Sequence, residues 1–382
     1  MHFEPFVMER LQSTWENRVA WNVSESGVQP LRLEELVRTP EERAALFAQE
    51  LAYTQSNGTA ELRRLIALQY PGATEDHIEV TNGGSEANCL VLLHLVQAGE
   101  QAVMMLPNYM QVGGIGRALG AHVVPWPLVE DETRGRWRPD LEALAKLVTS
   151  RTRVILLCNP NNPTGARLTS EELDGIGQIA DEVGAWVLSD EIYRGAERDG
   201  VETPSMWGRA RRVLVTNGLS KAYGLPGLRI GWVVGPPETV AVLWGIHDYT
   251  SIAPGALSDR LARVALEPSR RTELIARTRG IVRANYALLR NWIHSRLPLL
   301  DHIAPEAGAI ALVKYRHEVE STNLAERLRI EKSVLVVPGD HFGMGRYLRI
   351  GFGSDASHLA SSLERIGDVL DSIAGARLAD AR

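Results

Sequence analysis

The sequence predicts an α/β fold, in which a large, doubly wound and mostly parallel sheet is accompanied by a smaller α+β part. Three observations predict it. Short β-branched runs alternate with longer amphipathic stretches through the first two thirds of the chain, as in sheets whose strands are joined by helices. After about residue 254 the pattern changes to a long helical stretch followed by strand-like runs. The 382 residues also exceed what one small domain needs.

The strands of the large sheet are expected at short apolar runs, namely residues 78–81, 102–106, 122–125, 153–158, 185–189, 213–216 and 230–234. Several of these runs are apolar on both faces, which is typical of parallel strands covered by helices. The intervening helices are expected at residues 86–98, 140–147 and 170–183. The last of them begins with a capping box, in which Thr169 or Ser170 is followed by Glu172.

The smaller part is expected to combine helices and strands, with helices at residues 257–264, 271–295 and 358–373 and strands at residues 309–314, 334–337 and 347–351. The change in pattern also suggests the domain boundaries. We expect an N-terminal arm at residues 1–35 that packs on the small domain, a large domain at residues 36–254 and a small C-terminal domain at residues 255–382.

Composition argues against several classes of function. The chain has 41 basic and 47 acidic residues, a net charge of −6 and no basic stripe, which argues against a nucleic-acid partner. Cys89 and Cys158 stand alone, so neither a disulfide framework nor a zinc site is expected. Apolar runs are shorter than the roughly 20 residues of a membrane helix. Glu4 and Glu9 lie where a signal peptide is apolar. We therefore expect a cytoplasmic protein without a metal or a membrane partner.

The most informative motif is LSKAYGLPGLRIGW, at residues 219–232. Lys221 lies just beyond an expected strand, at a carboxyl end, where α/β sheets place their ligands. A lysine amine forms Schiff bases once burial or a neighbouring cation lowers its pKa. Arg229 follows eight residues later and can return to the same pocket. Taken alone, the motif is also typical of a surface lysine in a glycine-rich turn.

Two further motifs close expected strands. NPNNPTG, at residues 159–165, makes a rigid loop in which Asn162 presents an amide. In SDEIY, at residues 189–193, the Asp190 carboxylate can pair with a buried cation, and Tyr193 can point to the same site. Each motif by itself is also typical of a turn or a helix cap. The combination of the three strand ends is far more specific than any one of them.

This combination resembles the class I and II aminotransferases, enzymes of fold type I that use pyridoxal 5′-phosphate. The resemblance covers nearly the whole chain, in the family's order and at its spacings. It implies that Lys221 carries the cofactor as a Schiff base, and that Asp190 pairs with the pyridinium nitrogen and so makes the ring an electron sink. It also implies that Tyr193 and Asn162 hydrogen-bond the ring hydroxyl oxygen and that Arg229 binds the cofactor phosphate.

The resemblance assigns roles to further positions. TNGGSE opens an expected helix, whose free N–H groups make Gly83, Gly84 and Ser85 candidates for binding the phosphate. Tyr109 matches the aromatic residue that stacks on the cofactor. Tyr53 resembles the tyrosine that reaches the phosphate of the neighbouring subunit, which implies a homodimer with shared active sites.

The substrate side of the site is also implied by resemblance. Arg349, in YLRIGF, matches the arginine that grips the substrate α-carboxylate, and its planar fork suits that pairing. Asn162 is expected to contact the substrate as well. In NVSESGV, Gly27 lies in the segment that is close to the substrate in the family. Glu25 is a carboxylate that can bind a guanidinium or, alternatively, cap a helix or lie in a loop.

Two features depart from the ordinary family pattern. The family usually has Ser or Thr three residues before the lysine, where this chain has Gly218. The missing phosphate contact is worth about 1–3 kcal/mol unless Ser85, Arg229 or water replaces it. NVSESGV also replaces a Gly-x-Pro element. Together with LSKAYGLPGLRIGW and VLVVPGDHFG, it resembles the capreomycidine synthase branch, which acts on a hydroxylated arginine by elimination and ring closure.

The expected function is therefore transfer of an amino group between an L-amino acid and a 2-oxo acid. One alternative is an elimination and cyclisation enzyme of capreomycidine synthase type, and another is a non-catalytic relative that binds pyridoxal phosphate. GGIGRALG, at residues 113–120, resembles a dinucleotide-binding fingerprint. A true fingerprint leaves its strand directly, whereas residues 107–112 intervene here, so a dehydrogenase is not expected.

Overall fold

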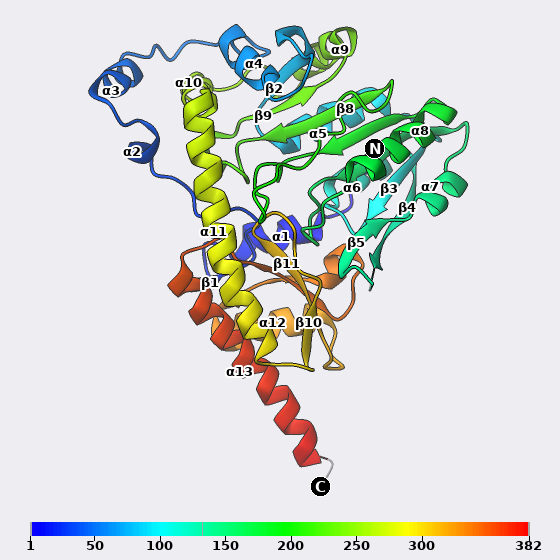
Figure 1. Cartoon of the computed structure of the whole chain (residues 1–382), viewed down its shortest axis with the longest axis vertical. Helices are drawn as coiled ribbons and strands as arrows, with labels where there is room; N and C mark the ends of the chain where they lie inside the picture. Colours follow the sequence, from blue (N-terminus) through cyan, green and yellow to red (C-terminus); the bar gives the residue numbers. More distant parts are fainter. Residues whose placement is uncertain (1, 132, 381–382) are drawn as a thin grey trace.

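A computed structural model describes residues 2–131 and 133–380 of the chain. Its centre is a sheet of eight strands in the order β2-β9-β8-β7-β6-β3-β4-β5 (Figure 1). The strands are β2 (Ile78–Thr81), β3 (Gln101–Leu106), β4 (His122–Asp131), β5 (Arg136–Pro139), β6 (Thr152–Cys158), β7 (Trp186–Asp190), β8 (Val213–Gly218) and β9 (Gly231–Val234). Neighbours from β8 to β4 pair in parallel, whereas β9 is antiparallel to β2 and β8, and β5 to β4. The predicted large, mostly parallel sheet is confirmed.

Helices connect and cover these strands. They are α4 (Ala60–Ala67), α5 (Gly84–Leu95), α6 (Gln111–Ala118), α7 (Leu141–Leu147), α8 (Ser170–Val183) and α9 (Pro237–His247). The predicted capping box begins α8, because the Thr169 hydroxyl accepts a hydrogen bond from the Glu172 amide and the Glu172 carboxylate accepts one from the Thr169 amide. Helix α6 contains the glycine run that resembles a dinucleotide fingerprint. A Cβ at Gly113 would meet Met104 Sδ at 2.7 Å, so the glycine allows this helix to pack closely on the sheet.

A second sheet has the order β10-β11-β14-β13, and β1 pairs with β12. Helix α11 runs from the side of the large sheet down to this smaller part (Figure 1). These strands are β1 (Trp21–Asn22), β10 (Leu300–His302), β11 (Ile310–Tyr315), β12 (Val334–Leu335), β13 (Val337–Pro338) and β14 (Tyr347–Gly351). The helices that follow α9 are α10 (Ala256–Leu266), α11 (Pro268–His294), α12 (Ser321–Lys332) and α13 (Ala356–Asp380). Helix α10 was expected in the smaller part, but it packs against α4 and shares the apolar core of the large part.

One expected strand is divided in two. The run expected at residues 334–337 forms β12 and β13, which pair with different partners, β1 and β14. Both runs are buried and apolar, so their pattern could not indicate the change of partner. The parallel pairing of β1 with β12 joins the N-terminal segment to the smaller sheet.

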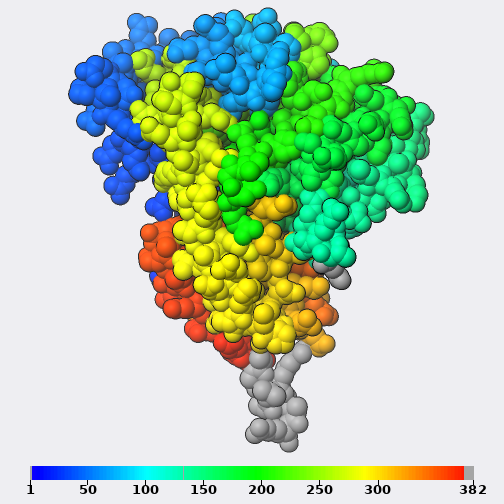
Figure 2. Space-filling view, viewed as in Figure 1, coloured from blue at the N-terminus to red at the C-terminus, as the bar shows by residue number. Residues whose placement is uncertain are grey.

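The N-terminal segment contains three helices, α1 (Val7–Trp15), α2 (Leu33–Leu36) and α3 (Pro40–Phe47). Helix α1 lies between the large and the small parts (Figure 1), and the segment with α2 and α3 lies at the margin of the molecule (Figure 2). Val23 and Val28 pack into the apolar core of the small part, among residues such as Leu289 and Ile350. In the described residues, no helix combines the length and the apolar character that crossing a bilayer requires.

Candidate active site

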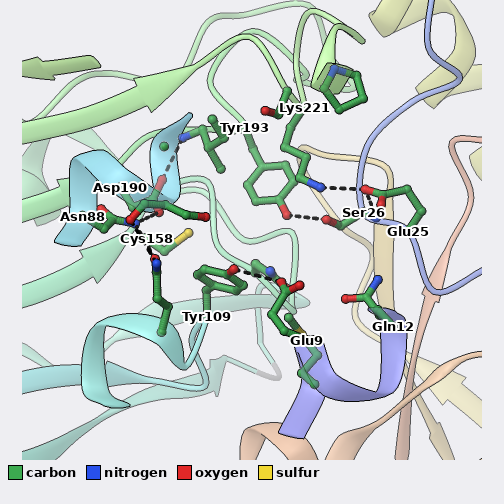
Figure 3. A pocket seen from close by; sticks show the side chains of 18 of the residues that line it. Glu9, Gln12, Glu25, Ser26, Asn88, Tyr109, Cys158, Asp190, Tyr193 and Lys221 are labelled. Carbon is green, nitrogen blue, oxygen red and sulfur yellow. Dashed lines mark hydrogen bonds and ion pairs between the residues drawn. The ribbon is translucent and has the colours of Figure 1, made fainter. Parts of the chain in front are cut away.

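The polar loops at the ends of three parallel strands meet at one cavity. Cys158, Asp190 and Thr216 are aligned neighbours at the carboxyl ends of β6, β7 and β8. The loops beyond them surround a cavity of about 450 Å³ (Figure 3). Nine of the residues expected in the site line it, namely Glu25, Gly84, Ser85, Tyr109, Asn162, Asp190, Tyr193, Lys221 and Arg229. The structure therefore brings together motifs that are more than 190 residues apart, as the Lys221–Glu25 contact shows.

Lys221 forms an ion pair inside the cavity. Its Nζ lies 2.6 Å from Glu25 Oε1, which also accepts hydrogen bonds from the backbone amides of Ser26 and Gly27 (Figure 3). The Lys221 ammonium lowers the pKa of Glu25 to about 2. Burial by itself lowers the pKa of Lys221, but the Glu25 carboxylate and Tyr193 together outweigh burial, and the pKa of Lys221 is raised. Both groups are therefore charged, and Lys221 becomes a nucleophile only after it loses a proton.

Tyr193 is a buried hydrogen-bond donor in the same cavity. Its hydroxyl donates to Ser26 Oγ at 2.9 Å (Figure 3). Burial raises the pKa of Tyr193 to about 12, so its hydroxyl keeps its proton near neutral pH. A protonated phenol here can donate a hydrogen bond to an oxygen atom of a bound group.

Asp190 is held by a chain of polar side chains. One of its carboxylate oxygens, Oδ2, accepts from Asn88 Nδ2 at 2.9 Å, and Oδ1 accepts from the Ile192 amide at 3.1 Å. Asn88 Oδ1 in turn accepts from the Thr216 hydroxyl at 2.7 Å. Burial raises the pKa of Asp190, and its two donors oppose that shift. Asn88 was not expected in the site, although its position four residues after Gly84 on α5 is a signal that places both on one face of the helix.

One side of the cavity is suited to an anion. Helix α5 begins at Gly84, and Gly83 precedes it with φ +94°, a conformation that favours glycine. The first N–H groups of a helix have no partner within it and attract anions. Arg229 packs so closely on Gly83 that a Cβ there would overlap the guanidinium. Ser220 Oγ lies 3.5 Å from Arg229 Nη1 and also borders the cavity, so a hydroxyl is available two residues after Gly218.

The pairing of β8 with β9 explains the glycine at position 218. Gly218 lies opposite Gly231, and a Cβ on it would lie 2.8 Å from the Ile230 carbonyl oxygen and 3.1 Å from Gly231 Cα. Both contacts are with backbone, which cannot move aside cheaply. The hydroxyl side chain that the family usually has at this position does not fit.

We therefore expect Gly218→Ser to destabilise the protein by about 1–3 kcal/mol, because overpacking forces the two strands apart. Urea unfolding of the protein without cofactor measures this decrease in the free energy of unfolding. Gly245→Ser is the matched control, since a Cβ at Gly245 meets nothing within 4 Å. Equal stability of the two variants would contradict the steric explanation.

Four expected site residues do not line the cavity. Gly83 lies behind Arg229, and Gly27 lies behind Lys221, where its Cβ would be 3.5 Å from Lys221 Cδ. Arg349 is 1% exposed and lies behind Asn162. Tyr53 is 88% exposed, outside the cavity. The roles expected for these residues stay predictions.

Arg349 is only partly satisfied by its surroundings. Its Nη1 donates to Asn162 Oδ1 at 3.0 Å and its Nη2 to the Ser24 carbonyl at 2.6 Å, with Met8 Sδ 3.4 Å away. Within the described part of the chain, its buried Nε has no hydrogen-bond partner. Burial lowers the pKa of Arg349, so an incoming carboxylate would relieve both the unmet donor and the unfavourable burial.

Helix α1 forms a wall of the cavity that the sequence did not predict. The Tyr109 hydroxyl donates to Glu9 Oε1 at 2.9 Å (Figure 3), and Gln12 Nε2 donates to the Ser24 carbonyl at 3.0 Å. Phe6 packs edge-on against Tyr109, with ring centroids 5.1 Å apart. The contact of Tyr109 with Glu9 joins residues 100 positions apart, and no local sequence signal indicates it.

The fold and this site define an enzyme that depends on pyridoxal phosphate. The chain belongs to the family of aminotransferase class I and II, whose model matches residues 24–366. Capreomycidine synthase of Streptomyces vinaceus is 31% identical over 322 residues, which are 84% of this chain and 82% of the relative. Valine–pyruvate aminotransferase of Mycobacterium tuberculosis is 30% identical, over 86% of each chain. A solved PLP-dependent aminotransferase from Streptococcus suis is 33% identical with a TM-score of 0.91, over 98% of this chain and 99% of that one.

The residues in the cavity fit this cofactor. The start of α5, together with Arg229 and Ser220, suits a phosphate. Asp190 supplies a half-buried carboxylate for a ring nitrogen, and Lys221 supplies the amine. The predicted family, enzyme class and cofactor are thus confirmed by the comparisons.

Proposed function

We propose that the protein transfers an amino group from an L-amino acid to a 2-oxo acid, with the cofactor bound covalently to Lys221. The observation that carries this proposal is the convergence of Lys221, Asp190, Tyr193 and Asn162 on one cavity that also has an anion-binding side. Membership of the aminotransferase family supports it. One of the relatives, valine–pyruvate aminotransferase, is named for a reaction of the same kind.

The residues predicted from the sequence to bind the cofactor would hold it as follows. Asp190 pairs with the ring nitrogen and keeps it protonated, while Tyr193 donates to the ring oxygen. Asn162 Oδ1 already accepts from Arg349, so the amide nitrogen is the group of Asn162 that donates to the cofactor. Gly83, Gly84, Ser85 and Arg229 hold the phosphate, and Tyr109 lies against the ring. When bound, the cofactor withdraws electrons from the substrate carbon that loses a proton.

The remaining residues bind the substrate and move its proton. Arg349 binds the α-carboxylate in a two-point pairing that satisfies its buried Nε. Lys221 Nζ would accept the α proton of the substrate and release it again on the other side of the substrate nitrogen. Glu25, which accepts from Lys221 at 2.6 Å, keeps the released amine beside the reacting carbon. Gly27 donates its backbone amide to Glu25 Oε1 at 3.0 Å and so helps to hold this carboxylate beside Lys221 on the substrate side of the site.

The dependence of turnover on a 2-oxo acid tests this proposal. Amino-group transfer consumes one equivalent of 2-oxo acid for each amino acid. We expect no sustained turnover when 2-oxoglutarate or pyruvate is left out, across a panel of amino acids that includes arginine derivatives. Continued turnover without any 2-oxo acid would contradict amino-group transfer.

A second candidate function is elimination and ring closure on an arginine-like substrate. Glu9, Glu16 and Glu25 all line the cavity, and burial together with the charges of Glu25 and Glu9 raises the pKa of Glu16. Such a wall suits a cationic guanidinium. The similarity to capreomycidine synthase supports this candidate. Sustained turnover of a hydroxylated arginine without a 2-oxo acid is the outcome that favours it.

The Glu25–Lys221 pair predicts how stability depends on pH in the protein without cofactor. The pKa of Glu25 is about 2 in the folded chain against 4.5 ordinarily, so the carboxylate stabilises the fold above pH 4.5 and this contribution fades as the pH falls toward 2. We expect Glu25→Gln to be less stable than the unchanged protein at pH 7, and the difference to shrink below pH 4.5. Urea unfolding at several pH values checks this, with Glu34→Gln as an exposed control. A difference independent of pH would contradict it.

We also propose a homodimer with shared sites. Exposed apolar residues support it, among them Phe47, Leu51, Tyr53 and Tyr249. If Tyr53 serves the partner's phosphate, mixing inactive Lys221→Ala with Tyr53→Ala subunits restores about a quarter of the sites, because half of the randomly formed dimers then contain one complete site. No recovery on mixing would contradict sharing.

The domain boundaries expected from the sequence remain a proposal, with an arm at residues 1–35, a large domain at 36–254 and a small domain at 255–382. The pairing of β1 with β12 and the separate apolar core of the small part support them. The charge of −6 without a basic stripe supports a protein that acts on small molecules rather than on nucleic acid, and a cytoplasmic location remains part of the proposal.

A further inference from the structure

A buried cluster of charged side chains lies behind the anion-binding side of the cavity. Its members are Glu79 on β2, Glu86 in the first turn of α5 and His247 at the end of α9. The side chains of Glu79 and His247 are 0% exposed. His247 Nδ1 lies 2.7 Å from Glu79 Oε1, and its Nε2 lies 3.4 Å from Glu86 Oε2. The imidazole thus bridges two carboxylates that the proposed reaction does not use.

This cluster is tied to the turn at residues 82–85 that precedes and opens α5. Glu86 Oε2 accepts from the Asn82 amide at 2.6 Å. Asn82 Nδ2 donates to Ser251 Oγ at 2.6 Å, and Ser251 Oγ lies 3.0 Å from His247 Nε2. The turn that presents the Gly84 and Ser85 amides to the cavity is therefore fixed from behind by the cluster.

The charges in the cluster follow from this geometry. Burial by itself lowers the pKa of His247, but its bonds to Glu79 and Glu86 outweigh burial and raise it to about 9. Burial raises the pKa of Glu79 to about 7. Burial also acts to raise the pKa of Glu86, but hydrogen bonds from His247, Asn82, Ser251 and Thr250 bring it to about 2. Near neutral pH His247 is a cation and Glu86 an anion.

Glu86 lies in the same first turn of α5 as Gly84 and Ser85, so without a compensating cation its carboxylate would repel the proposed phosphate. We propose that His247 is a positioning residue for the cofactor phosphate, because its charge neutralises Glu86 and its hydrogen bonds fix the turn at residues 82–85. This inference rests on the proposed phosphate site at Gly84, Ser85 and Arg229. It adds a residue from α9, outside the cavity, to the determinants of cofactor affinity.

Comparing two forms of the cofactor tests the inference. Protein freed of cofactor is titrated with pyridoxal phosphate and with pyridoxal, which lacks the phosphate, and the absorbance of the adduct on Lys221 is followed. For His247→Gln we expect the Kd for pyridoxal phosphate to rise about tenfold and the Kd for pyridoxal to stay within twofold. The inference would be overturned if His247→Gln raised both Kd values by the same factor, or if it raised neither of them.

Removal of the opposing charge gives an independent readout. Glu86→Gln by itself is expected to tighten pyridoxal phosphate without changing pyridoxal, and the double variant His247→Gln with Glu86→Gln is expected to recover the affinity of the unchanged protein. A double variant that binds as weakly as His247→Gln would overturn the electrostatic role. The unchanged protein tests the phosphate site separately from His247. If it bound pyridoxal as tightly as pyridoxal phosphate, the proposed phosphate site would be wrong, whatever the variants of His247 show.

Discussion

Lys221→Ala is expected to lower turnover by about 10³-fold or more, because one side chain supplies both the covalent link to the cofactor and the base that moves the α proton. The variant should still bind the cofactor through Asp190, Arg229 and the start of α5, but without the absorbance of the lysine adduct. Steady-state rates with an amino acid and a 2-oxo acid, together with an absorbance spectrum, measure both effects.

Lys314→Ala is the matched control, since Lys314 lies on β11 outside the cavity. The control should keep both its rate and its spectrum. A Lys221→Ala protein that retained even a hundredth of the original turnover would contradict the central role of this lysine.

Asp190→Asn is expected to lower turnover by about 10²-fold, because a charged partner of the ring nitrogen is replaced by a neutral amide. A hydrogen bond to a charged group is worth about 1.5–3 kcal/mol, and each 1.4 kcal/mol is tenfold in rate. The amide has nearly the shape of the carboxylate, so the cofactor should still bind to Lys221. The expected signature is a large fall in kcat with the adduct absorbance retained.

Asp174→Asn serves as the control for this change, since Asp174 is an exposed residue of α8 paired with Arg209. The control should keep kcat within twofold of the unchanged protein. If the kcat of Asp190→Asn were less than threefold below that of the unchanged protein, the assignment of Asp190 to the ring nitrogen would be wrong.

Much of the fold could be predicted because several strands of the large sheet, such as β2, β8 and β9, are buried on both faces. In β6, residues 154–158 are all apolar and buried, so their composition alone indicates a covered strand. Helix α1 and strand β5 could not be predicted in the same way. Each is short, and each depends on tertiary contacts, such as the pairing of Glu130 with Trp137 across β4 and β5.

The candidate site was predictable where its residues follow strand ends. Asp190 is the last residue of β7, and Lys221 and Asn162 lie in the loops that follow β8 and β6. Parallel strands place their carboxyl ends together, so these residues meet. The ion pair of Lys221 with Glu25 joins residues 196 positions apart, which no spacing rule relates. The sequence placed Glu25 near the substrate, but the structure alone places it on the lysine amine.

The glycine at position 218 shows what sequence comparison leaves out. From the sequence, Gly218 is a missing hydroxyl. From the structure, it is the residue that lets β8 lie against β9, and Ser220 offers a hydroxyl nearby. Position 218 must be glycine because the backbones of two strands come into contact there. That contact depends on the register of β8 and β9 and cannot be predicted from the neighbouring residues in the sequence.

The most direct test of the central claim is to identify the lysine that holds the cofactor. The sequence contains four lysines, Lys146, Lys221, Lys314 and Lys332, so the assignment is unambiguous. The protein loaded with pyridoxal phosphate is reduced with borohydride, digested and mapped by mass spectrometry. We predict one modified peptide, with the reduced cofactor on Lys221. Modification of another lysine, or of none, would contradict the account.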